Sequence, residues 1–233
     1  KQAAQGQFSL LRQAEDVSVL LEDPDTPEDL RERLQLVQSM LQFAEQELKL
    51  SVEGRYQRYV SLDQDYVMWS VFVAPPLAMK SVQWCYPVVG CAPYRGYFDE
   101  ARATAFAANY AAEGFDTYVG RVPAYSTLGW FKDPLLSSFL YFTEATLANL
   151  LFHELAHSKV WLKGDVAFNE SFASFVGVQG ANRWVSLGQD QFEEGLTQWR
   201  LRELHWQRFK TFALAATADL TSLYEGQTGG DAE

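Results

Sequence analysis

LLFHELAHSKVW, at residues 150–161, is the stretch on which the interpretation of the whole chain depends. It places His153 and His157 four residues apart, so that on a helix both imidazoles project from one face and can reach one ion. Glu154 lies beside them, where a carboxylate can take the proton of a zinc-bound water. Burying these polar groups among leucine and phenylalanine would be costly without a partner, and a metal ion is one. The segment therefore predicts a helix that holds one zinc ion.

A third protein ligand is needed for a catalytic zinc site with one open position. The chain has only 3 histidines, so the third ligand is either His205 or a carboxylate. The tripeptide KGD at residues 163–165 predicts a short turn, and FNESFASF at residues 168–175 then begins a second helix. Since so short a connection returns the chain to the end of the first helix, we expect Glu170 to lie near His157.

The pair of motifs HELAH and NESFAS resembles the gluzincin arrangement of the thermolysin and alanyl-aminopeptidase families, in which HExxH is followed by NExxA or NExxS. The chain as a whole, with WCYPVVGC (84–91), YRGYFDE (94–100) and VPAYSTLGW (122–130), resembles the bacterial putative aminopeptidase family, whose members are usually exported lipoproteins. This resemblance implies a zincin-like fold, a zinc cofactor and a periplasmic location.

The resemblance assigns roles to four residues of this chain: the zinc ligands His153, His157 and Glu170, and the catalytic base Glu154. Two features depart from the thermolysin pattern. Only 12 residues separate His157 from Glu170, and Ser174 stands where thermolysin-like enzymes have an aspartate that orients a ligand. Asp133 and Asp165 are the candidates for that orienting role here.

Loops between the expected strands and helices supply the remaining site candidates. Tyr125 is the first candidate for a hydrogen-bond donor to the oxyanion, ahead of residues in PYRGYF. The neighbouring Ser126 and Thr127 lie on a segment to which an extended peptide can pair as an added strand. Arg95 and Tyr97 are candidates for binding substrate. Ordinary packing is the alternative for each of these side chains, and also for three large rings that otherwise form an apolar substrate pocket: Trp130, Phe131 and Trp161.

Composition narrows the classes of partner. A net charge of -11 argues against nucleic acid, because neutralising phosphates requires clustered lysine and arginine. It also disfavours an anionic membrane surface. The expected partner is a peptide or protein substrate, as the resemblance to metallopeptidases implies. No run approaches the roughly 20 apolar residues that span a bilayer. Since the first residue is Lys1, we expect that an N-terminal export signal with its lipid anchor has been removed.

The cysteines and the helical pattern define the expected organisation. Cys85 and Cys91 flank a turn and form either a disulfide or a pair of buried thiols. Apolar residues at helical spacing predict an N-terminal helical hairpin packed on the core in residues 1–51, with helices near 5–21 and 27–48. The catalytic domain is expected at residues 52–228 and a disordered tail at 229–233. Within this domain we expect strands near 66–74 and 115–120 and helices near 98–113, 143–162, 168–178 and 189–224.

The sequence thus predicts an α+β, zincin-like metallopeptidase domain, mostly helical with a small sheet, plus the N-terminal hairpin. The predicted function is that of a zinc-dependent peptidase, with aminopeptidase as a candidate mode of cleavage. Two alternatives remain: a non-catalytic zinc-binding or scaffold protein of the cell envelope, and a metallohydrolase that acts on an amide other than a peptide.

Overall fold

A computed structural model describes residues 11–86, 90–124, 132–187 and 193–228. Its elements are helices and three small sheets, so the prediction of an α+β protein, mostly helical with little sheet, is confirmed. The chain forms two compact units, one from Met68–Val122 and Arg200–Glu233, the other from Ala4–Val67 and Pro123–Trp199. Across the described residues, no helix combines the length and the apolar character needed to cross a bilayer.

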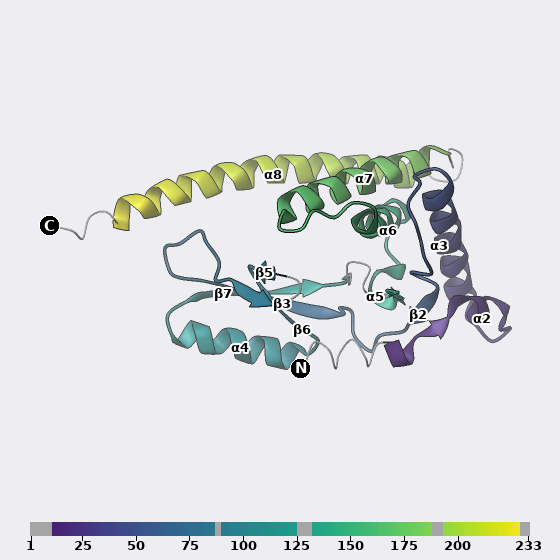
Figure 1. Cartoon of the computed structure of the whole chain (residues 1–233), viewed down its shortest axis with the longest axis horizontal. Coiled ribbons are helices and arrows are strands. Elements are labelled where there is room, and N and C mark those ends of the chain that lie inside the picture. The colour runs from purple at the N-terminus through teal and green to yellow at the C-terminus, as the bar shows by residue number, and fades with distance from the viewer. Residues whose placement is uncertain (1–10, 87–89, 125–131, 188–192, 229–233) are drawn as a thin grey trace. The chain divides into compact units, whose positions relative to one another are not determined.

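The unit that contains Met68–Val122 is built on an antiparallel sheet of three strands, in the order β6-β3-β7 (Figure 1). These strands are β3 (Met68–Ala74), β6 (Arg95–Tyr97) and β7 (Asp116–Val122). The central strand, MWSVFVA, is rich in β-branched and aromatic residues and buries Trp69, Val71 and Val73. The predicted strands near 66–74 and 115–120 are therefore confirmed.

Helix α4 (Glu100–Ala112) packs on this sheet and contacts β3 and β7. It begins where the side chain of Asp99 accepts a hydrogen bond from the backbone N–H of Arg102 at 2.8 Å. It ends before Gly114, whose φ of +89° suits a residue without a side chain. Its boundaries agree with the predicted helix near 98–113.

The two cysteines form a disulfide, one of the two outcomes that the sequence left open. Strands β4 (Trp84–Tyr86) and β5 (Gly90–Ala92) pair as a hairpin in which Cys85 lies directly opposite Cys91. Their Cα atoms are 3.8 Å apart. The disulfide therefore closes a short loop at the end of this hairpin.

The other unit contains three packed helices, α3 (Glu28–Gln46), α6 (Glu144–Lys159) and α7 (Val166–Leu187). The apolar stripe of α3 is buried, as its helical spacing predicts. The ring of Phe43 on α3 lies 5.6 Å from that of Phe152 on α6 and 5.3 Å from that of Trp184 on α7. Helix α3 thus shares a core with the two motif helices, α6 and α7.

A second small sheet, β1-β2-β8, interrupts the predicted N-terminal helix. Its strands are β1 (Glu15–Asp16), β2 (Arg58–Val60) and β8 (Leu135–Leu136), the last followed by the short helix α5 (Ser137–Leu140). Because Glu15 and Asp16 pair with β2, the helix expected near 5–21 is wrong at residues 14–16, whereas residues 11–13 and α2 (Val17–Glu22) are helical. Residues 5–10 of that prediction lie outside the described residues.

The C-terminal helix α8 (Glu193–Thr228) confirms the long helix expected near 189–224. Helix α7 is longer than predicted. The sequence pattern predicts that this helix ends near residue 178, whereas it continues to Leu187. Gly180 does not end the helix but packs against α6, where an added Cβ atom would lie 2.7 Å from the side chain of Phe152. The tail at residues 229–233 and residues 189–192 lie outside the described residues.

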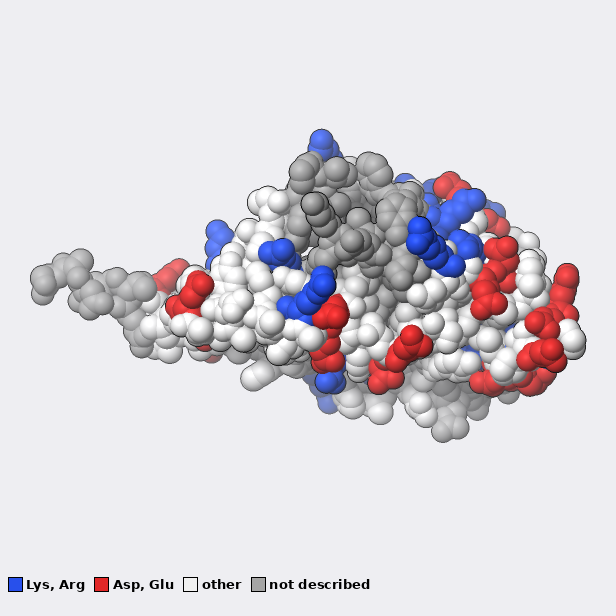
Figure 2. All heavy atoms as spheres, turned by 90° about the horizontal axis from the view of Figure 1, so that it is seen from below, with Lys and Arg blue, Asp and Glu red and all other residues white. Residues whose placement is uncertain are grey.

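Acidic side chains gather on the surface around α2 and the first turns of α3 (Figure 2). The exposed members of this group are Glu22, Asp23, Asp25, Glu28, Asp29 and Glu32. A surface of this sign repels phosphate groups.

Candidate metal centre

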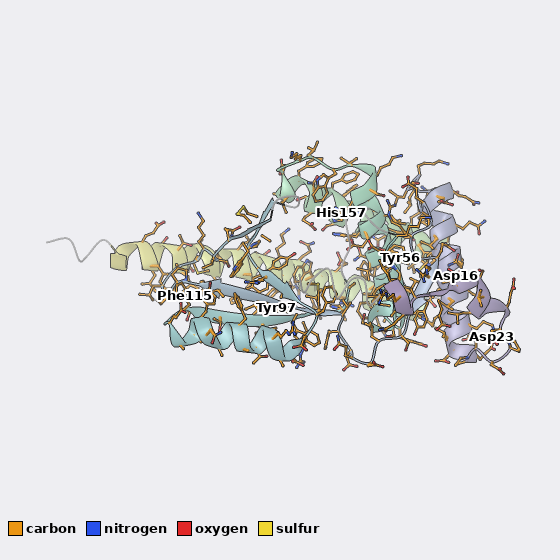
Figure 3. The ribbon with its side chains drawn as sticks, turned by 60° about the horizontal axis from the view of Figure 1, so that its bottom comes forward. Asp16, Asp23, Tyr56, Tyr97, Phe115 and His157 are labelled. Carbon is orange, nitrogen blue, oxygen red and sulfur yellow. A yellow bond between two sulfur atoms is a disulfide. The ribbon has the colours of Figure 1, made fainter. Side chains whose placement is uncertain are left out.

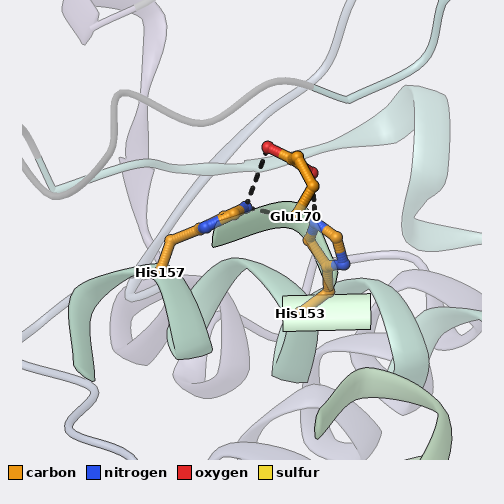
Figure 4. A group of neighbouring side chains, drawn as sticks. All are labelled: His153, His157 and Glu170. Carbon is orange, nitrogen blue, oxygen red and sulfur yellow. Dashed lines mark hydrogen bonds and ion pairs between the residues drawn. The ribbon is translucent and has the colours of Figure 1, made fainter. Parts of the chain in front are cut away.

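Three side chains from α6 and α7 converge on one point (Figure 4). The Nε2 atoms of His153 and His157, on α6, are 3.2 Å apart. Glu170, in the first turns of α7, places one carboxylate oxygen 3.4 Å from Nε2 of His153 and the other 3.6 Å from Nε2 of His157. The side chain of His157 is only 4% exposed, whereas that of Glu170 is 53% exposed, so the group is anchored in the core and open on its carboxylate side.

The separations within this group suit a tetrahedral metal ion. When ligand atoms lie about 2.0–2.1 Å from a tetrahedral ion, neighbouring ligand atoms lie about 3.3–3.4 Å apart. The observed separations of 3.2, 3.4 and 3.6 Å are close to that value. Two imidazoles and one carboxylate are also a donor set that divalent ions such as zinc bind. The residues present therefore fit a metal ion.

Burial keeps both imidazoles in the form that binds a metal. It lowers the pKa of His153, as does the neighbouring His157 to a smaller degree, while Glu170 opposes the change. Burial likewise lowers the pKa of His157, again against the effect of Glu170. Since the ordinary pKa is already 6.5, both rings are neutral at pH 7 and keep a lone pair for a metal.

The connection between α6 and α7 is held by side-chain hydrogen bonds. The carboxylate of Asp165 accepts from the backbone N–H of Phe168 at 2.9 Å and so caps α7. Asn169 is almost fully buried, and its amide both donates to and accepts from the backbone of Leu162, each bond 2.8 Å long. These bonds fix the backbone immediately before Glu170, so the carboxylate enters the site from a defined position.

Neither predicted orienting aspartate serves the buried ring nitrogen of His157. Among the described residues, Nδ1 of His157 is buried and has no hydrogen-bond partner. Asp165 caps α7, and the backbone oxygen of Asp133 accepts from the N–H of Tyr56 at 2.8 Å. The position of Asp165 in the sequence did not show whether it caps a helix or orients a metal ligand.

Helices α6 and α7 approach closely at Gly177. A Cβ atom built there would lie 2.7 Å from Oδ1 of Asn149, 2.8 Å from its backbone oxygen and 3.1 Å from Cβ of His153. Gly177 is seven residues after Glu170, two helical turns along the same face of α7. The absence of a side chain at this position therefore allows Glu170 and His153 to come within contact distance.

We expect Gly177→Ala to destabilise the protein by about 1–3 kcal/mol, because an added methyl group overpacks a backbone contact that cannot yield. Urea unfolding of the metal-free protein, followed by circular dichroism, measures the change. Gly226→Ala is the matched control: Gly226 is also helical but has open space around it, so alanine there should be neutral or slightly stabilising. Equal stabilities of the two variants would contradict the proposed close approach.

Glu154 follows His153 on α6 and is partly buried. Its negative charge acts on the phenol of Tyr56, which is fully buried: burial first, then Glu154 and Asp133, raise the pKa of Tyr56 well above its ordinary value. Tyr56, labelled in Figure 3, has a φ of +60°, unusual for a bulky residue, and is fixed there by its bond to Asp133. The phenol of Tyr56 is therefore neutral, and it lies close enough to Glu154, the predicted base, for the charge of Glu154 to raise its pKa.

The neighbouring Arg55 ties this segment to the end of α6. Its guanidinium is buried and donates to Oγ of Ser158 at 3.1 Å and to the backbone oxygen of Ser51 at 3.0 Å. Ser158 immediately follows His157. The segment that holds Tyr56 is thus attached to the helix that carries both histidines.

Of the other predicted site residues, Trp161 lies beside this group, with its ring centre 5.7 Å from that of His157. Tyr125, Ser126 and Thr127 lie outside the described residues, as do Trp130 and Phe131. Arg95 and Tyr97 belong to the other compact unit, where the guanidinium of Arg95 lies 4.8 Å from the ring centre of Phe106 and 5.6 Å from that of Tyr97 (Figure 3). His205 is an exposed residue of α8 in that same unit.

Three residues of the site were missed by the sequence analysis. Asn169 had a local signal, because it stands directly before Glu170 in the NESFAS motif. Gly177 and Tyr56 had none: the role of the first depends on the helix that packs against it, and the second lies about a hundred residues from Glu154 in the sequence.

The fold and this group define an α+β protein with a candidate metal site of two histidines and one glutamate, next to a second glutamate. A comparison with protein families gives its affiliation. The model of the family described as "Putative aminopeptidase" matches residues 1–233, and the chain belongs to this family. The family name indicates a peptidase, a hydrolase that acts on peptides. No curated protein and no solved structure matches the chain.

Proposed function

We propose that this protein is a zinc-dependent peptidase. The observation that carries the proposal is the group of His153, His157 and Glu170, whose metal-binding atoms lie within 4.8 Å of one another. Membership of a family named for aminopeptidases supports a peptide as the substrate. The HExxH motif and the downstream glutamate support a gluzincin-type site in a zincin-like domain.

The chemistry divides between the ion and the residues of the chain. His153, His157 and Glu170 would hold a zinc ion, which would supply Lewis acidity at the site. Glu154 takes the proton of the attacking water and passes it to the departing amine, as a general base and then a general acid. The exposed carboxylate side of the group gives a peptide access. Tyr125 stays the predicted hydrogen-bond donor to the oxyanion.

The disulfide supports an exported protein. Disulfides form and persist in oxidising compartments and are rare in the cytosol, and the hairpin of Cys85 and Cys91 carries one. We therefore propose a periplasmic location for the protein. Labelling of the free thiols in freshly isolated protein, with and without reduction, reports whether the disulfide is present there.

A mixed peptide library tests the proposed function. The protein loaded with one equivalent of zinc is incubated with the library, and mass spectrometry identifies the cut positions. We expect cleavage that a chelator abolishes and added zinc restores. Removal of single N-terminal residues would identify an aminopeptidase, and internal cuts an endopeptidase. Stoichiometric zinc binding without any cleavage would contradict the proposal and favour a non-catalytic zinc-binding protein of the cell envelope.

A further inference from the structure

Large apolar side chains are exposed along the connection between α6 and α7. Trp161 is 42% exposed, and Leu162, Val166 and Phe168 are exposed to a similar extent. Four large apolar side chains thus face solvent within eight consecutive residues, next to the group of His153, His157 and Glu170. An exposed apolar patch of this kind is typical of a surface that binds apolar groups of a ligand or partner.

The backbone that displays these side chains is well held. Asn169 clamps Leu162 through two hydrogen bonds, and Asp165 caps the helix that follows. Gly164, with a φ of +88°, makes the turn between them. The exposure of the apolar residues is therefore built into an ordered connection.

Trp161 adjoins the metal-binding group directly. Its ring centre lies 5.7 Å from that of His157, with the two planes at 70°, an edge-to-face contact. His157 in turn lies 3.6 Å from the carboxylate of Glu170. The half-exposed indole thus contacts a predicted ligand, while its exposed surface is available to a substrate bound at this group.

A peptide whose carbonyl group is held at this ion must place its neighbouring side chains against the surroundings of the group. We propose that Trp161 is a specificity-determining residue: it forms the wall of an apolar subsite that selects peptides with a large apolar or aromatic side chain next to the scissile bond. This inference rests on the proposed peptidase function. An indole suits the role because it offers a large, rigid apolar face at little cost in conformational entropy.

Matched peptides that differ only in the residue beside the cut, leucine or phenylalanine against alanine or serine, test the subsite. The wild-type protein should favour the large side chains in kcat/KM, and Trp161→Ala should reduce this preference by on the order of 10-fold without slowing the small substrates. Trp161→Phe should keep most of the preference. Leu187→Ala is the control, because Leu187 is exposed but lies at the other end of α7, seventeen residues or about 25 Å along the axis from Glu170.

Two further measurements separate the possible outcomes. Zinc affinity, measured by competition with a chromophoric chelator, should be the same in Trp161→Ala as in the wild type. A loss of zinc or an equal loss for all peptides would show that Trp161 only supports His157, and would overturn the proposal.

Calorimetry with amino-acid hydroxamates tests the subsite without hydrolysis. The leucine compound should bind the zinc-loaded protein on the order of 10-fold more tightly than the alanine compound, and Trp161→Ala should remove the difference. Failure to cleave peptides together with this binding difference would refute the peptidase and keep the apolar subsite. Equal binding of the two compounds by the wild type would refute the subsite.

Discussion

Glu154→Gln should lower kcat for peptide hydrolysis by about 10²–10⁴-fold, the range that a general base contributes, and leave zinc uptake unchanged. The amide has nearly the shape of the carboxylate but cannot accept a proton at neutral pH. Since Glu154 is not among the three residues whose donor atoms converge, the metal-binding group should survive the change. Initial rates with a peptide found by the library, and zinc content after gel filtration, give the two measurements.

Glu144→Gln is the matched control for this variant. Glu144 lies in the first turn of the same helix, ten residues or about 15 Å along the axis from Glu154. The Glu144→Gln substitution also removes one negative charge from α6, yet the peptidase activity should remain at the wild-type level. If Glu154→Gln kept more than about a tenth of the wild-type activity, the assigned base would be wrong.

Glu170→Ala should weaken zinc binding by at least about 100-fold, because the site would keep only two protein ligands. The fold should be little affected, since the side chain of Glu170 is 53% exposed and α7 is held by its own cap and packing. Competition with a chromophoric chelator measures the affinity. The rise in unfolding temperature that zinc gives the wild type should also be lost, because binding to the native state is its source.

Glu32→Ala is the control for the metal experiment. Glu32 is an exposed carboxylate of α3 in the same compact unit, so its removal changes the net charge equally without touching the group of His153, His157 and Glu170. Its zinc affinity should match the wild type. Unchanged zinc affinity in Glu170→Ala would remove this residue from the ligand set, and the third ligand would have to be sought elsewhere.

The class of fold and the principal helices and strands followed from local patterns. The apolar stripe of α3, the β-branched run of β3 and the stop at Gly114 each depend on neighbours within a few residues, and all three are found where the patterns predicted. The N-terminal helix failed where such reasoning must fail. Glu15 and Asp16 have no strand signal of their own, and pairing with β2, more than forty residues away in the sequence, decides their conformation.

The spacing within HELAH was enough to place His153 and His157 on one face of a helix, since the 3.6-residue repeat fixes where side chains four positions apart point. A short turn was enough to bring Glu170 near them. The distance between α6 and α7 depends instead on the close contacts of Gly177 and Gly180 with side chains and backbone of α6. The surroundings of Glu154 depend on Tyr56, whose backbone has a positive φ. Only the tertiary structure decides these features. Close packing depends on which residues, distant in the sequence, come into contact in the core, and no local repeat in the sequence determines those contacts.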